Sequence, residues 1–524
     1  MDTDETAAEI TGVTAGRTLV DALADNARRH PDMPALRWRS GDGGGWQTLT
    51  WQRYRDEIRH ATLGLRAVGV RPGEHVGLLM SNRSELAIAD LALLHLRAVP
   101  VCLFDSFTAE QLDIVLDSLQ IGLCIVDGEA QRERLAGSGR RFVALDDGSW
   151  DALVGAGRET EAAEFDACCR QVRPEDIVAV NYTSGTTGSL KGVRHSHRNV
   201  VWHAESFARL LPLEPGTRFL SYLPRAHATE RFVTTWLPLC RTGTVHLCAE
   251  PARLPDYLRE VRPQFFGGVL QVWEKLYAAA IASNLDSAAL GLDECGFAFS
   301  GGGALAVSVQ EFFHRLGIPL TEGWGQSELV SAATCAAPGR IRAGTVGTAL
   351  PGVAVRVATD GELLVRTGSR MVGYLDPSLS YGDEDGWLHT GDLGEIEDDG
   401  YVRVLGRREE VFRLADGYPV PVTRIESQLR ANPLVNQACV IGEGREDLVA
   451  LLVVGAPPQL WSHEALEQIV AQANRHLPAR EQIARFAVLQ GVWEPGWAEE
   501  LTHTGKLRRG LITSKHADVL RAML

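Results

Sequence analysis

Residues 182–192 read Tyr-Thr-Ser-Gly-Thr-Thr-Gly-Ser-Leu-Lys-Gly, and this stretch is the most informative part of the chain. Its inner glycines let backbone N–H groups turn toward an anion, its hydroxyl groups add further donors, and Lys191 adds a positive charge. It is not a Walker A loop, because no glycine directly precedes Lys191 and no serine or threonine directly follows it. Lys191 is also one of only four lysines, with Lys275, Lys506 and Lys515, among 52 basic residues. The stretch therefore predicts a loop that binds a polyphosphate.

The composition is that of a globular protein and excludes several functions. The 524 residues are 45% hydrophobic and 23% charged, which suggests two to four domains at roughly 150 residues each. The 52 basic and 67 acidic residues give a net charge of −15, which argues against binding nucleic acid or an anionic membrane surface. Nine cysteines without a CxxC pair fit reduced thiols rather than a disulfide framework or a zinc site.

The chain shows no targeting or membrane-spanning segment. Residues 1–16 lack both a basic region and an apolar core, so they do not resemble a signal peptide. Asp90, His95 and Arg97 interrupt the longest apolar stretch, residues 86–103, so it is too broken to span a bilayer. We therefore expect a cytoplasmic protein.

Strand and helix patterns alternate over the first 400 residues. Short apolar runs predict strands at 75–80, 121–126 and 176–182, and helices are expected at 84–96 and, with Ser196 as N-cap, at about 197–211. This alternation is typical of a largely parallel α/β core. The predicted fold is a large N-terminal α/β domain with parallel sheets, spanning residues 1–406.

A smaller α+β domain is expected over residues 407–524. A strand is predicted just before it, at residues 401–405. Within the domain, the predicted strands are residues 435–441, 448–454 and 486–489, and the predicted helices are residues 422–430 and 462–476. The polar run Arg407-Arg408-Glu409-Glu410 marks the junction between the two domains.

Further motifs follow the phosphate loop in a fixed order. They are Tyr222-Leu-Pro-Arg-Ala-His227 with Glu230-Arg231, Ser300-Gly-Gly-Gly-Ala-Leu305, Gly323-Trp-Gly-Gln-Ser-Glu328, Thr390-Gly-Asp392, Gly406-Arg407 with Leu414-Ala-Asp-Gly417, and Leu501-Thr-His-Thr-Gly-Lys506. Together with residues 183–192, this series resembles the adenylate-forming superfamily, and within it the bacterial long-chain acyl-CoA synthetases. The resemblance covers roughly residues 17–510 and implies a small, mobile C-terminal domain.

The resemblance implies an ATP- and AMP-binding site. Its residues are Thr183, Ser184, Gly185, Thr187, Gly188, Lys191, Gly301, Gly302, Gly303, Trp324, Gly325, Ser327, Asp392 and Arg407. In physical terms, the glycines at 301–303 permit the close approach of a purine and Trp324 offers a stacking face. Asp392 is able to accept hydrogen bonds from the ribose hydroxyl groups.

The implied catalytic residues are Thr186, His227, Glu328 and Lys506. Glu328 is expected to hold Mg²⁺ against the phosphates, and Lys506 is expected to swing in from the small domain about a hinge at Glu409. Neutralising the repulsion between two reacting anions is the main catalytic task of such a lysine. His197 matches a family histidine, but a structural role at the start of a helix is equally consistent with its position.

The implied reaction is ATP-dependent activation of a large hydrophobic carboxylic acid as an acyl-AMP, followed by thioester formation with CoA. The expected acyl pocket involves His227, Trp236, Gly268 and Val269, where no charged group is placed to bind an amino group or a second acid. Linear and bulky polycyclic acids both remain open, as do the oligomeric state and the pathway. A luciferase-like oxygenase and a catalytically inactive nucleotide-binding protein are weaker alternatives.

The chain departs from the family pattern at several places, among them Trp324, Ser327 and Glu409, and two departures bear most on the reaction. Leu190 replaces the usual proline before the loop lysine, which reduces preorganisation of the turn. Tyr418-Pro-Val-Pro421 replaces small or polar residues in a loop that flanks the pantetheine channel in the family, and prolines lack an N–H donor. The alternative function is therefore adenylation alone, with the acyl-AMP passed to a partner enzyme or carrier protein in specialised metabolism.

Overall fold

The computed structural model describes residues 3–39, 44–135, 139–184, 190–211, 213–408, 410–457, 459, 461–491, 493, 500–501 and 507–523, without the side chains of Ser184 and Gln490. Several expected site residues lie outside this description: Gly185, Thr186, Thr187, Gly188, Glu409, Lys506 and the side chain of Ser184.

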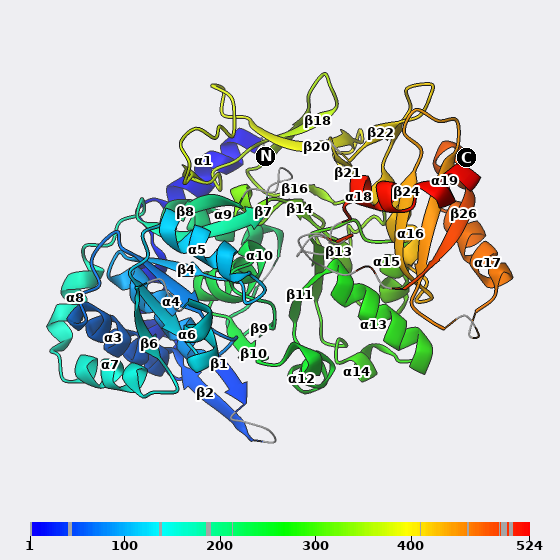
Figure 1. Ribbon diagram of the computed structural model, residues 1–524. Coiled ribbons are helices and arrows are strands. Elements are labelled where there is room, and N and C mark those ends of the chain that lie inside the picture. The colour runs from blue at the N-terminus through cyan, green and yellow to red at the C-terminus, as the bar shows by residue number, and fades with distance from the viewer. Residues whose placement is uncertain are drawn as a thin grey trace.

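Two parallel sheets form the large N-terminal part (Figure 1). The first has the order β4-β3-β5-β6, with bounds Val99–Cys102, His75–Leu79, Leu123–Val126 and Arg141–Ala144. The second has the order β13-β12-β11-β9-β10-β1-β2, with bounds Leu320–Glu322, Phe297–Gly301, Phe265–Val269, Arg218–Ser221, Thr244–Leu247, Pro34–Arg39 and Trp46–Thr50. Every neighbouring pair is parallel except β1–β2. The predicted α/β class is confirmed.

Helices cover both sheets. Those of the large part are α1 (Thr3–Thr14), α2 (Leu19–Arg29), α3 (Trp51–Ala67), α4 (Ser84–His95), α5 (Ala109–Ser118), α6 (Glu129–Leu135), α7 (Ser149–Arg158), α8 (Ala162–Cys169), α9 (His197–Leu210), α10 (Ala228–Arg231), α11 (Leu237–Cys240), α12 (Leu254–Val261), α13 (Leu270–Ser283), α14 (Ser287–Leu290) and α15 (Val307–Arg315). The predicted helix at 84–96 is α4, in which every side chain except that of Glu85 is buried, which explains its nearly continuous apolar sequence.

The phosphate-loop region lies in a three-stranded sheet of order β19-β8-β7. β7 (Ile177–Ser184) pairs antiparallel with β8 (Leu190–Ser196), and β8 pairs with β19 (Gly373–Tyr374). Helix α9 then begins at His197, and the side chains of Ser196 and Asn199 form a capping box at its N-terminus. The strand and the N-cap expected from the sequence are both confirmed.

A four-stranded antiparallel sheet leads to the small domain. Its order is β17-β18-β20-β21, with bounds Ala354–Val357, Glu362–Arg366, Leu388–Ile396 and Val402–Arg407. The remaining short strands of the large part are β14 (Trp324–Gly325), β15 (Ala332–Cys335) and β16 (Thr348–Ala349). The domain boundary between residues 406 and 407, which we keep as a proposal, falls at the end of β21.

The small domain contains a sheet of order β24-β25-β26, in which β24–β25 is antiparallel and β25–β26 is parallel. Its elements are β22 (Phe412–Arg413), β23 (Pro419–Val420), α16 (Val422–Arg430), β24 (Val435–Ile441), β25 (Leu448–Val454), α17 (His463–Asn474), β26 (Ile483–Gln490), α18 (Arg509–Lys515) and α19 (Ala517–Met523). The predicted order of strands and helices over residues 422–490 is confirmed.

The small domain lies beside α13 and α15 of the large part (Figure 1). Ser427 Oγ on α16 donates a 2.7 Å hydrogen bond to the carbonyl oxygen of Ala304, directly after the Gly301–Gly303 segment. Arg430 Nη2 lies 3.6 Å from Glu274 Oε1 on α13. The helix that opens the small domain therefore contacts the segment expected to bind the purine.

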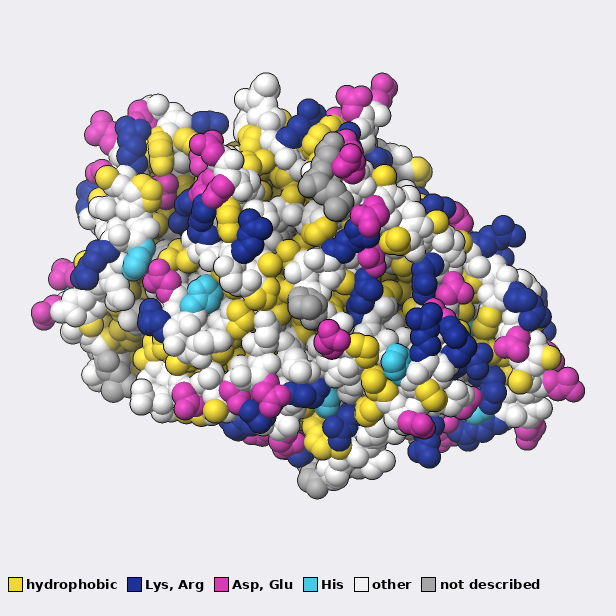
Figure 2. Space-filling view, turned by 180° about the vertical axis from the view of Figure 1, so that it is seen from behind, with side chains coloured by type: hydrophobic (Ala, Val, Ile, Leu, Met, Phe, Trp, Pro, Cys, Tyr) yellow, Lys and Arg dark blue, Asp and Glu magenta, His cyan; other side chains and the backbone are white. Residues whose placement is uncertain are grey.

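Charged side chains of both signs lie on the surface. On the face seen in Figure 2, acidic and basic side chains are spread over the molecule, with a group of Lys and Arg side chains toward the right of the view. Within the described ranges, no helix is both long enough and apolar enough to cross a membrane.

Candidate active site

Three of the expected binding segments follow the carboxyl ends of adjacent parallel strands. In the strand register, Val269 at the end of β11 pairs with Gly301 of β12, and Ser300 pairs with Glu322 at the end of β13. Ligands of open α/β sheets bind at this edge. Residues 267–269, 301–303 and 323–328 are thus brought to one place, as a shared site requires.

Asp392 is the centre of a polar network. Its Oδ2 accepts hydrogen bonds from Trp324 Nε1 at 2.8 Å and from Gln326 Nε2 at 3.0 Å. Its Oδ1 lies 3.0 Å from Nε of Arg407, the residue opposite it in the β20–β21 pair. Gln326 Nε2 and Arg407 Nη1 also donate to the carbonyl oxygen of Thr390, at 2.6 and 2.9 Å. Three donors therefore fix the orientation of this buried carboxylate.

This network limits what Asp392 is able to bind. A carboxylate offers about four acceptor positions, and three of those of Asp392 are occupied. Two ribose hydroxyl groups would therefore need one protein donor to move away. Trp324 is buried, 7% exposed, and its contact in the structure is with this carboxylate. Its stacking on adenine stays a prediction.

Glu328 lies beside Tyr374 and Lys191. Tyr374 OH donates a 2.8 Å hydrogen bond to Glu328 Oε1, and Lys191 Nζ lies 5.9 Å from the centre of the Tyr374 ring. Burial, and then the negative charge of Glu328, raise the pKa of Tyr374, so its hydroxyl stays a proton donor. The strand pairs Thr183–Lys191 and Val193–Tyr374 place the carboxylate next to the stem of the phosphate loop.

The carboxylate of Glu328 suits Mg²⁺, a hard cation that prefers oxygen ligands. No group of three or more His, Cys, Asp or Glu side chains that would hold a metal ion occurs in the described part of the chain. Protein sites for Mg²⁺ commonly supply one or two carboxylates and leave the other positions to water and substrate phosphates. The residues present therefore fit a metal that arrives with a nucleotide.

The glycines of the candidate site have different reasons to be glycine. A Cβ on Gly325 would lie 1.9 Å from the carbonyl oxygen of Ser331, so this position is fixed by backbone packing. Gly302 has φ +84°, and no atom would lie within 4 Å of its Cβ, so it adopts a left-handed turn in open space. Of these two glycines, only Gly302 leaves room for a ligand.

Alternation along β11 divides the expected acyl-pocket residues between two faces. Gly267 and Val269 are half-buried, and a Cβ on Gly267 would lie 3.4 Å from Cγ1 of Val233. Gly268 points the opposite way, where its Cβ would lie 2.7 Å from Trp273 Nε1. The structure thus places Gly268 against the core, whereas Gly267 shares the half-exposed face with Val269.

Trp236 and His227 lie on the segment that leads to this face. Trp236 is fully buried at the end of the π-helical turn η1 (Phe232–Trp236), with the Arg231 guanidinium 5.2 Å from its ring centre. His227 is the N-cap of α10, and burial lowers its pKa, so its imidazole is neutral at pH 7. An uncharged His227 offers no counter-ion for a second acidic group on a substrate.

His197 has a structural contact. Its side chain is 1% exposed, and its Nδ1 accepts a 3.1 Å hydrogen bond from the backbone N–H of Leu19, the first residue of α2. Burial lowers the pKa of His197 to about 3, which keeps Nδ1 available as an acceptor. The imidazole therefore joins the start of α9 to the start of α2. Ser327, by comparison, offers its carbonyl oxygen to the His195 ring nitrogen at 2.7 Å.

The sequence reasoning missed three polar residues of the site. Gln326 lies inside a quoted motif but was not assigned a role; it binds Asp392 and accepts a 2.6 Å hydrogen bond from Tyr381 OH. Tyr374 and Tyr381 lie in a stretch without a recognised motif. A polar residue inside a glycine-flanked motif was a usable signal for Gln326, whereas the tyrosines had none.

Comparison with known proteins agrees with this geometry. Residues 23–375 match the family described as AMP-binding enzyme, and residues 410–523 match the AMP-binding enzyme C-terminal domain. The chain belongs to the AMP-binding enzyme family. The putative fatty-acid–CoA ligase FadD11 of Mycobacterium tuberculosis is 34% identical over 426 residues, covering 68% of this chain and 74% of the relative. The long-chain-fatty-acid–CoA ligase FadD15 of Mycobacterium bovis is 28% identical over 561 residues, covering 92% and 93%.

Solved structures share the fold of this AMP-binding enzyme. The anthranilate CoA ligase AuaEII in complex with anthranoyl-AMP has a TM-score of 0.79 at 22% identity, covering 95% of this chain and 97% of its own. The O-succinylbenzoate CoA synthetase MenE of Bacillus subtilis with ATP and magnesium has a TM-score of 0.76 at 22% identity, covering 95% and 99%. The chain is thus an adenylate-forming ligase of the AMP-forming acid–thiol class, for which acid activation and CoA ligation are the general activity.

Proposed function

We propose that this AMP-binding enzyme activates a large, uncharged, hydrophobic carboxylic acid with ATP and Mg²⁺ and transfers the acyl group to CoA. The observation that carries the proposal is the pairing of Val269 with Gly301 at the end of the parallel sheet. It sets the apolar face of Val233, Gly267 and Val269 directly beside the segment expected to bind the purine.

The first half-reaction joins the acid to the α-phosphorus. A carboxylate oxygen attacks, the bond from this phosphorus to the bridging oxygen breaks, and pyrophosphate leaves. Lys191 and the loop N–H groups would hold the phosphates, while Asp392 would hold the ribose. Glu328, oriented by Tyr374, would hold Mg²⁺, which supplies charge neutralisation when bound. Lys506 would neutralise the two approaching anions.

The second half-reaction transfers the acyl group. The CoA sulfur attacks the acyl carbonyl carbon, AMP leaves, and the thiol proton passes to solvent. The small domain would rotate about Glu409 between the two halves. Relatives named fatty-acid–CoA ligases support both halves and a long acyl chain.

The alternative is adenylation without thioester formation, with a partner enzyme or carrier protein as acceptor. Its support is the segment before α16, where Pro419 lies in β23 and Pro421 is the residue before the helix. Neighbouring Tyr418 OH donates a 2.9 Å hydrogen bond to Glu481 Oε1, which adds to the rigidity of this turn. A rigid turn at this place would hinder a pantetheine arm.

One reaction analysed by mass spectrometry separates the two proposals. The full chain is incubated with ATP, Mg²⁺, CoA and a pool of linear, polycyclic and amino acids. Acyl-CoA from a hydrophobic acid supports the full synthetase, and accumulation of acyl-AMP with CoA unchanged supports the alternative. Products from amino acids alone would refute the apolar pocket. If a Pro419→Ala, Pro421→Ala double variant gains CoA transfer, this turn is what prevents acyl transfer to CoA in the wild type.

A further inference from the structure

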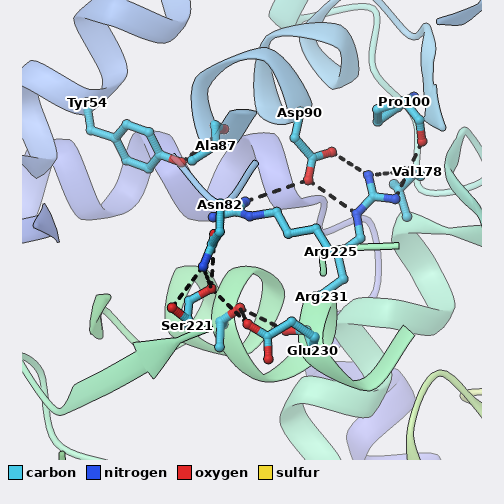
Figure 3. Close-up of polar contacts among 11 residues, drawn as sticks. Tyr54, Asn82, Ala87, Asp90, Pro100, Val178, Ser221, Arg225, Glu230 and Arg231 are labelled. Carbon is cyan, nitrogen blue, oxygen red and sulfur yellow. Dashed lines mark hydrogen bonds and ion pairs between the residues drawn. The ribbon is translucent and has the colours of Figure 1, made fainter. Parts of the chain in front are cut away.

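A cluster of buried charged side chains, several of them from residues 225–231, lies beside the segment that carries His227 (Figure 3). Asp90 on α4 and Arg231 on α10 are fully buried. Arg225 lies in the loop between β9 and α10 and is 3% exposed. Arg231 binds the Asp90 carboxylate through two nitrogens, Nε at 3.2 Å from Oδ2 and Nη2 with Oδ1. Arg225 Nη1 lies farther away, 4.0 Å from Oδ2.

The charges of this cluster do not balance well. Asp90 is already engaged by both arms of Arg231, which leaves Arg225 with only a long contact. Glu230 is the other buried carboxyl group, but its Oε1 accepts hydrogen bonds from Ser221 Oγ at 2.8 Å and Thr234 Oγ1 at 3.0 Å. Burial raises the pKa of Glu230 to about 7 against the attraction of the Arg225 charge, so near neutral pH Glu230 compensates only part of that charge. Part of a positive charge is therefore left over in the interior, where an uncompensated charge is costly.

A small, partly open cavity of about 20 Å³ adjoins Arg225. Its wall is otherwise mostly apolar and is formed by Ala35, Leu36, Trp51, Tyr54, Leu91, Arg225, Thr234, Thr235, Pro238, Leu239 and Val245. A cavity of this size holds one water-sized occupant, because a single probe sphere needs roughly 10–15 Å³. It is too small for an acyl chain or a nucleotide.

Three residues of this wall carry buried polar atoms without a hydrogen-bond partner among the described residues. These atoms are Arg225 Nε and Nη1, Trp51 Nε1 and Thr235 Oγ1. The arginine and indole nitrogens are obligate donors, and the threonine hydroxyl is able to donate as well. Buried donors are nearly always satisfied in folded proteins, so several unpaired donors around one cavity indicate an acceptor in it.

We propose that this cavity, lined by Trp51, Arg225 and Thr235, is a binding site for a small monovalent anion of the halide type. An anion accepts hydrogen bonds from all of these donors and also compensates the charge of Arg225. A water molecule would need acceptors for its own hydrogens and would leave that charge uncompensated. The site would brace the turn that connects Arg225 to the segment bearing His227.

Crystals of the full chain grown in sodium bromide test the occupant directly. Bromide scatters anomalously at its absorption edge and water does not. We expect an anomalous peak in the cavity within hydrogen-bonding distance of Arg225 and Trp51. Density without an anomalous signal, or no density at all, would overturn the proposal.

A solution test compares two buried threonines that differ in their partners. Thr235 Oγ1 is unpaired beside the cavity, whereas Thr62, which is not part of the cavity wall, donates from Oγ1 to the carbonyl oxygen of Ile58 at 2.7 Å. Melting temperatures are compared in sodium chloride and sodium gluconate at equal ionic strength. We expect chloride to raise the melting temperature of the wild type by roughly 2 °C or more, because a ligand that binds the folded state stabilises it.

The variants then assign this shift to the cavity. Thr235→Val should lose most of the chloride-dependent shift, and Thr62→Val should keep it whatever its own stability. Arg225→Met should also lose the shift. If Arg225→Met does not fold, the Thr235→Val variant alone still tests the site. An unchanged shift in Thr235→Val, or a wild type that melts equally in both salts, would refute the site.

Discussion

The indole N–H of Trp324 donates a 2.8 Å hydrogen bond to Asp392 Oδ2, joining two residues that are 68 positions apart in sequence. Gln326 and Arg407 complete the shell of donors around the same carboxylate. The residue expected to bind ribose is thus oriented before any nucleotide arrives, and preorganisation of this kind reduces the cost of binding. Nucleotide affinity should therefore depend on the donors that orient Asp392 as well as on Asp392 itself.

Trp324→Phe removes this donor and keeps an aromatic ring. A lost hydrogen bond to a charged group costs about 1.5–3 kcal/mol, so KM for ATP in pyrophosphate exchange should rise roughly tenfold or more. Trp202→Phe is the matched control, because Trp202 Nε1 donates to Thr11 Oγ1 outside the site. Equal KM values for the two variants would show that the Trp324–Asp392 bond has no part in nucleotide binding.

Tyr374→Phe removes the hydroxyl group that orients Glu328. We expect a higher Mg²⁺ concentration for half-maximal adenylation and a decrease in kcat of about tenfold, since a charge-assisted hydrogen bond is lost. Tyr401→Phe, which removes a hydroxyl bonded to the carbonyl oxygen of Arg340, serves as the control. A Mg²⁺ titration curve unchanged from the wild type would argue against a metal-binding role for Glu328.

Lys506→Ala should reduce adenylation about 10²–10³-fold, as expected for the loss of one preorganised charge donor. The acyl-AMP, once supplied, should still react with CoA, because the proposed role concerns the first half-reaction. Lys515→Ala is a suitable comparison, since Lys515 Nζ is 2.8 Å from Glu500 Oε1 in a partly exposed ion pair. Adenylation at the wild-type rate in the Lys506 variant would remove this lysine from the mechanism.

Glu322→Gln should change the pH dependence of stability. Burial raises the pKa of Glu322 from 4.5 to about 8, so the folded chain keeps this proton at pH values where the unfolded chain has lost it. The unfolded state then binds fewer protons between these two pH values, and the free energy of unfolding of the wild type falls as the pH rises. The variant lacks this loss, so its stability relative to the wild type should increase by up to about 1.4 kcal/mol per pH unit across this window.

Urea denaturation at pH 5, 6.5 and 8 measures the effect. Glu129→Gln provides the control, because the Glu129 side chain is 70% exposed. A difference between Glu322→Gln and wild type that stays constant over this range would mean that Glu322 titrates normally in the folded chain.

The local parts of this structure were predictable from the sequence. Helix α16 has the predicted bounds, Val422–Arg430, because its apolar residues recur at helical spacing after Pro421. Ser196 was predicted as an N-cap from its position before an amphipathic run, and its side chain accepts from the backbone N–H of Asn199. Both signals lie within a few residues of the feature that they predict.

Contacts between distant segments were not predictable in the same way. The bond from Tyr374 to Glu328 exists because β19 adds to the edge of β8, and nothing near residue 374 indicates that pairing. Gly268 was assigned to the acyl pocket from its position in sequence, but its face of β11 is set by the packing of Trp273. One residue along a strand reverses the face, so motif position alone does not assign a pocket residue.

The direct pairing of Asp392 with Arg407 across β20 and β21 has an evolutionary consequence. Insertion or deletion of a single residue within either strand would turn one of these side chains to the opposite face of the ribbon. Homologous chains should therefore accumulate length variation at the turn around Asp398–Gly400 and keep the spacing within the strands. An alignment of relatives would show this as a gap-free block on each side of a short variable tip.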